Sequence, residues 1–135
     1  MAPKIFAQLL VQFIGENVWD RRITDLRKQY QPKPAIAQAP CRKVKIQSIS
    51  KNSSHPAAGQ HGLFAAQTLH PGEHILDYLG YVTTEEFAEE SQYVAQLAPN
   101  ILVDASKMGS EARCGVSVKP LQTIGTEKTF DFKGL

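Results

Sequence analysis

The chain has 135 residues, of which 42% are hydrophobic and 21% are charged, as expected for a single globular domain. Two cysteines, Cys41 and Cys114, cannot on their own form a four-ligand zinc site or a disulfide framework, which favours an intracellular, reducing environment. The formal net charge of +2 excludes no class of partner. The distribution of charge along the chain says more about possible partners.

Basic and acidic residues are separated along the chain. Residues 21–45 contain eight basic residues against one acid, and residues 72–106 contain seven acids and no Lys or Arg. Both runs are consistent with solvated faces, or with a basic arm and an acidic surface that attracts basic peptides. Trp19 and Tyr30 are spaced as helix-core residues rather than as stacking platforms, which disfavours direct nucleic-acid binding.

The first apolar stretch, Ile5 to Ile14, is interrupted by Gln8 and Gln12 and is too short to span a bilayer. It has no small-residue cleavage site and is not Arg-rich, so we expect neither a secretory nor a transit signal. These features predict a soluble protein that is not secreted and has no membrane partner.

The N-terminal region has the periodicity of a helix. Apolar residues recur at steps of three and four between residues 4 and 30, with Gly15 as a break and Asn17 as a candidate cap. Prolines then mark an extended segment, because proline cannot continue a helix. We therefore predict a helical N-terminal extension over residues 1–31, a Pro-rich linker over 32–43 and a domain over 44–135.

The remainder predicts a mostly β fold of small sheets, which with the N-terminal α-helical extension defines the expected fold class. A turn is expected at Pro71-Gly72, and a helix is expected to begin after Thr83 or Thr84. The predicted strands cover residues 44–49, 62–66, 75–82, 101–103, 116–118 and 129–132.

Three blocks of residues resemble the SET domain of S-adenosylmethionine-dependent protein-lysine methyltransferases. The first joins the glycine turn of residues 59–65 to a Pro-Gly-Glu turn and to Tyr78-Leu79-Gly80. The second, residues 103–113, is similar to the family's Asp-Ala and Gly-Asn-x-x-Arg-Phe segments, and the third, residues 125–132, to its terminal Gly-x-Glu-Leu-Thr-Phe-Asp-Tyr. The resemblance covers residues 44–135, and its specificity comes from the order of the three blocks.

The departures from the family pattern concern the active site. The family's Asn-His-Ser-Cys segment, which follows Arg-Phe, is missing after Arg113. Tyr81 replaces the usual Glu, Ser110 the usual Asn and Lys128 the usual Leu, and Phe132 stands at the position of the terminal Tyr. A phenylalanine there keeps the ring and loses the hydroxyl, a type of loss that costs about 3 kcal/mol of transition-state stabilisation.

The resemblance implies roles for individual residues. S-adenosyl-L-methionine would be the cofactor, and Tyr78 with Phe132 would line the channel of the substrate lysine. The implied cofactor-binding residues are Gln60, His61, Gly62, Leu63 and Arg113. A loop glycine, a packed strand tyrosine and a surface arginine are the competing structural interpretations of Gly62, Tyr78 and Arg113. No metal site is expected, because Pro71-Gly72 separates His70 from His74.

Three hypotheses follow for the function. The chain is a small methyltransferase for protein lysines, such as those of a histone tail; or a catalytically inactive SET-like interaction module; or a truncated version of an active relative that has lost an internal block. Because the missing segment helps to bind the cofactor in the family, we expect methyl transfer to be weak or absent. The resemblance implies a nuclear location, and a cytoplasmic location is the alternative.

Overall fold

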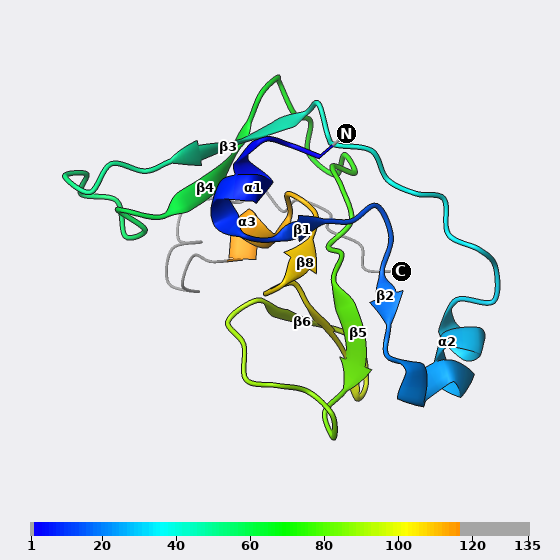
Figure 1. The fold of residues 1–135 in the computed structure, drawn as a ribbon. Coiled ribbons are helices and arrows are strands. Elements are labelled where there is room, and N and C mark those ends of the chain that lie inside the picture. The colour runs from blue at the N-terminus through cyan, green and yellow to red at the C-terminus, as the bar shows by residue number, and fades with distance from the viewer. Residues whose placement is uncertain (1, 117–135) are drawn as a thin grey trace.

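A computed structural model describes residues 2–116, which form short strands in three small sheets with a few short helices (Figure 1). This arrangement confirms the predicted mostly β class of small sheets, and the N-terminal region contains a short helix. The helical elements are α1 (Ile5–Leu9), the 3-10 helix η1 (Arg21–Ile23), α2 (Thr24–Tyr30) and α3 (Arg113–Val116). The strands are β1 (Gln12–Phe13), β2 (Val18–Trp19), β3 (Val44–Ser48), β4 (His61–Ala65), β5 (Tyr81–Thr84), β6 (Val94–Ala98), β7 (Ile101–Asp104) and β8 (Met108–Gly109).

The largest sheet has the strand order β2-β5-β7-β6. Its β5–β7 and β6–β7 pairs are antiparallel, and β2 joins the edge of β5 in parallel. Ile101 and Val103 on β7 are 1% and 0% exposed, whereas the residues after them are half-buried, because successive side chains of a strand point to opposite faces. β7 therefore presents its apolar face to the core.

The N-terminal region differs from the predicted helix over residues 4–30. Only α1, η1 and α2 are helical, and β1 and β2 between them pair in parallel with β8 and β5. Asn17 does not cap a helix: its side-chain oxygen accepts a hydrogen bond from the Gly80 N–H at 3.0 Å. The prediction failed because these pairings join residues about sixty or more positions apart, which local periodicity does not reveal.

The same N-terminal residues supply part of the hydrophobic core. Trp19 and Ile23 are 8% and 6% exposed and pack with Tyr78, Val82 and Val103. The Trp19 indole N–H also donates to the Gln31 side chain at 2.8 Å. Residues before the Pro-rich segment therefore pack on the predicted domain.

The predictions for the remaining elements had mixed outcomes. β3, β4 and β7 match predicted strands, and Gly72 has a φ of 77°, as the predicted Pro-Gly turn requires. The helix expected after Thr84 is wrong: residues 85–87 form a turn, and the Glu85 N–H is held by the Asn100 side chain at 3.1 Å. Strand β6 was not predicted, and residues 75–80 are not a continuous strand. The strands predicted after residue 116 lie outside the described residues, and Val116 itself ends α3.

Candidate functional site

Tyr78 lies in the core, in the segment between β4 and β5. Its side chain is 4% exposed, and its hydroxyl donates a hydrogen bond to the Tyr93 carbonyl oxygen at 2.7 Å. Burial raises the pKa of the Tyr78 phenol above its ordinary value of 10.0. The hydroxyl is therefore neutral at physiological pH and is already engaged within the protein.

Arg113, at the start of α3, is also buried. It is 6% exposed, its Nε donates to the Ala105 carbonyl at 2.9 Å, and its guanidinium carbon lies 4.3 Å from the centre of the Tyr93 ring. This geometry is a cation–π contact between the guanidinium group and the Tyr93 ring. Arg113 is therefore a packed residue and not the surface arginine of the competing interpretation. Arg113 and Tyr78 therefore meet through one residue, Tyr93.

Tyr93 is the residue of this cluster that the sequence did not identify. Its backbone N–H is held by the Ser91 hydroxyl at 3.0 Å, and that hydroxyl donates to the Asp104 carboxylate at 2.8 Å. Its carbonyl accepts from both Tyr78 and the Ala105 N–H. Tyr93 directly precedes β6, an element without a clear strand pattern, so no sequence signal marks it.

The four predicted cofactor-binding residues of the glycine turn lie at the start of β4. Gln60 is exposed, and its backbone is bonded to Ala57 and Ile49, while His61, Gly62 and Leu63 pair with β3. A methyl group on Gly62 would lie 2.9 Å from the Phe64 ring and 3.1 Å from Ile49. A larger residue at position 62 would therefore require the Phe64 ring to shift, whether or not a cofactor binds there.

The predicted residues are partly brought together. The helix α3, which Arg113 begins, packs against β4, which carries three of the four glycine-turn residues. Tyr78 joins Arg113 at Tyr93. Phe132 lies outside the described residues.

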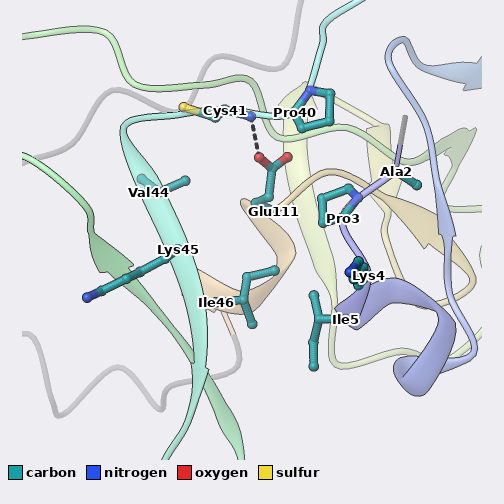
Figure 2. Close-up of a pocket in the computed structure, with 10 residues that line it drawn as sticks. All are labelled: Ala2, Pro3, Lys4, Ile5, Pro40, Cys41, Val44, Lys45, Ile46 and Glu111. Carbon is teal, nitrogen blue, oxygen red and sulfur yellow. Dashed lines mark hydrogen bonds between the residues drawn. The ribbon is translucent and has the colours of Figure 1, made fainter.

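A cavity of about 320 Å³ borders β3, the strand paired with β4, but is lined by none of the predicted site residues (Figure 2). Glu111 is at its centre in the view of Figure 2, only 3% exposed, with one carboxylate oxygen accepting the Cys41 backbone N–H. Burial raises the pKa of this carboxyl above its ordinary value of 4.5. The residues around it are Ala2, Pro3, Lys4, Ile5, Pro40, Cys41, Val44, Lys45 and Ile46.

Comparison with known proteins gives no relative: no family model matches the chain, and no curated protein is significantly similar to it. The SET resemblance therefore depends on the motif residues themselves. Between residues 2 and 116, no group of three or more metal-ligating side chains comes together. In the same part of the chain, every helix is too short or too polar to cross a bilayer.

Proposed function

We propose that this protein is a SET-like relative of the S-adenosylmethionine-dependent protein-lysine methyltransferases in which methyl transfer has been lost or strongly reduced. The ordered motif blocks support the ancestry, and the mostly β architecture of small sheets is compatible with it. The function is then that of an interaction module, present in the nucleus or cytoplasm.

The Tyr78 hydrogen bond is the observation that carries the loss of activity. Lysine methylation requires a neutral amine aligned with the methyl group, and positioning of this kind supplies much of the rate. In this chain the Tyr78 hydroxyl is 2.7 Å from the Tyr93 carbonyl oxygen and is held inside the core. A hydroxyl engaged in this way has its donor hydrogen occupied, and at 4% exposure Tyr78 offers little surface to a substrate amine.

The cofactor side of the proposed site is weakened as well. The sequence lacks the Asn-His segment that helps to hold S-adenosylmethionine in the family. The space next to Gly62 is occupied by Phe64 and Ile49. We therefore expect weak or undetectable cofactor binding.

The surface retains a feature suited to basic peptides. Four exposed carboxylates follow β5, and electrostatic attraction to such a run favours partners rich in lysine and arginine, such as a histone tail. The four residues are Glu85, Glu86, Glu89 and Glu90.

The test combines calorimetry with S-adenosylmethionine and a radiolabelled methyl-transfer assay on mixed histones. We expect no transfer above that of a sample without protein, together with salt-sensitive binding of histone-tail peptides. Clear transfer that disappears in Tyr78→Phe would contradict the loss of activity. If the protein bound neither basic peptides nor the cofactor, the proposal of an interaction module would lose its support.

A further inference from the structure

Glu111 is a buried acid whose hydrogen bonding is incomplete. One carboxylate oxygen accepts the Cys41 N–H, and the other, Oε1, has no hydrogen-bond partner within the described residues. A buried polar atom without a partner destabilises a folded protein, and the penalty is larger when the atom carries charge. A ligand that donates to Oε1 would remove this penalty.

The surroundings of Glu111 define what such a ligand must look like. Figure 2 shows the Glu111 carboxylate directed towards Cys41 and Pro40. Apolar side chains line the rest of the cavity: Pro3, Ile5, Val44 and Ile46. The cavity volume, about 320 Å³, is at the lower end of the range for small-ligand sites. An apolar body of a few carbons with one hydrogen-bond donor at its end matches these walls and this single acceptor.

We propose that this cavity binds a primary alkylammonium group, whose N–H donates to Glu111 Oε1 while its alkyl chain packs against the apolar walls. The ammonium group supplies the positive counter-charge that the buried carboxylate would otherwise lack. A charge-assisted hydrogen bond is also stronger than a neutral one. A free amine and a lysine side chain share this chemistry. The proposal is independent of methyl transfer, because the site contains none of the residues assigned to the cofactor or to the substrate channel.

Two lysines at the cavity, Lys4 and Lys45, carry charge of the same sign as the ligand. Both residues are exposed to solvent, which screens their charges, whereas Glu111 is nearly inaccessible. Figure 2 shows the Lys45 side chain directed away from the Glu111 carboxylate. The electrostatic selectivity of the cavity is therefore dominated by the buried acid.

Three probes of equal chain length test the proposal: butylammonium, butan-1-ol and butanoate. The Cys41 amide, bonded to the same carboxylate, serves as the reporter in ¹H–¹⁵N NMR titrations of the full chain. We expect saturable shifts of this amide with butylammonium, with an affinity on the order of millimolar, and much smaller shifts with the alcohol and the carboxylate. Equal binding of butanol, preferential binding of butanoate, or no saturation by any probe would overturn the proposal.

Variants assign the effect to the carboxylate. Glu111→Gln keeps an acceptor for the Cys41 N–H and removes the charge, so butylammonium affinity should fall at least about tenfold. Glu16→Gln, at an exposed position outside both the cavity and the acidic run, is the matched control and should bind as the wild type does. If Glu111→Gln does not fold, Glu111→Asp replaces it. This variant retains the charge and shortens the side chain, and undiminished selectivity for butylammonium over butanol would support the role of the charge.

A titration with Nα-acetyl-lysine amide then distinguishes the two sources of the ammonium group. Binding of butylammonium alone indicates a free amine, and binding of both compounds indicates a lysine side chain.

Discussion

Tyr78, which the resemblance would place in a substrate channel, is a core residue whose hydroxyl has an internal acceptor. Its hydroxyl donates to the Tyr93 carbonyl, which also accepts the Ala105 N–H at 2.9 Å. Tyr78→Phe therefore removes a donor without leaving that carbonyl unpaired, and we expect a loss of about 1 kcal/mol in the free energy of unfolding. Urea denaturation measures the change.

The matched control for this substitution is Tyr30→Phe. Tyr30 ends α2 and is 36% exposed, so its hydroxyl contributes little to folding and stability should change by less than about 0.5 kcal/mol. Equal effects of the two substitutions would show that the Tyr78 hydrogen bond is not a stabilising contact.

Asp20 is a second residue whose buried hydrogen bonds have a measurable consequence. Its carboxylate accepts from the Arg22 side chain and backbone and from the Thr83 hydroxyl at 2.9 Å. The bonds from Arg22 outweigh burial and hold the pKa of Asp20 well below its ordinary value of 3.8.

A depressed pKa in the folded state means that the unfolded chain binds the proton more tightly. The stabilisation from Asp20 is therefore complete well above pH 3.8 and is lost progressively as the pH falls below that value. Asp20→Asn should lower stability at neutral pH by about 1–3 kcal/mol and should flatten this part of the acid dependence. Urea titrations across the acid range measure both effects, with exposed Asp25→Asn as the control. An unchanged acid limb in Asp20→Asn would contradict the assignment.

At the scale of elements, the short strand β2 connects the N-terminal region to the core. Trp19 faces the core at 8% exposure, and its neighbour Val18 is 39% exposed on the other face. Trp19→Ala should therefore lower the free energy of unfolding by about 3–5 kcal/mol, enough to unfold a marginal domain.

Val18→Ala is the control on the same strand, and it should change stability by no more than about 0.5 kcal/mol. Circular dichroism and urea denaturation of the two variants measure the difference. Near-equal effects would mean that β2 is a peripheral attachment rather than part of the core.

Elements defined by local pattern could be predicted, and those defined by distant partners could not. β3, β4 and β7 carry their own β-branched or apolar pattern, and the Pro71-Gly72 turn carries its own backbone preference. β1 and β2 are each too short to show a period, and they are strands because β8 and β5 offer free edges to them. Their apolar residues therefore fitted a helix equally well.

The same distinction applies to the candidate site. The motifs identified Tyr78 and Arg113, and the structure joins these two residues. The residue that joins them, Tyr93, lies outside every motif, so the sequence could not show that the Tyr78 hydroxyl has an internal acceptor. Glu111 lies within a motif block, but its burial depends on Cys41, seventy positions earlier, and on the chain's first residues.

At the scale of the whole molecule, two buried carboxylates give the protein opposite responses to pH. Hydrogen bonds from Arg22 lower the pKa of Asp20, and burial raises the pKa of Glu111. The charges that line the cavity around Glu111 are those of Lys4 and Lys45, both exposed, and the Cys41 thiol is the other titratable group there. Burial is therefore the dominant influence on this carboxyl.

A raised folded-state pKa means that the folded protein binds the proton of Glu111 more tightly than the unfolded chain does. Its favourable contribution is present below pH 4.5 and is lost as the pH rises from there through the folded-state pKa. Glu111→Gln removes the buried charge and should raise the free energy of unfolding at neutral pH by about 1 kcal/mol, while leaving it nearly unchanged in acid. Urea titrations of this variant and of the exposed control Glu16→Gln at both pH values measure the difference. Saturating butylammonium should then stabilise the wild type at neutral pH and not Glu111→Gln, because a ligand stabilises only the state that binds it. A variant less stable than the wild type at neutral pH would show that the carboxylate is fully satisfied in the folded protein.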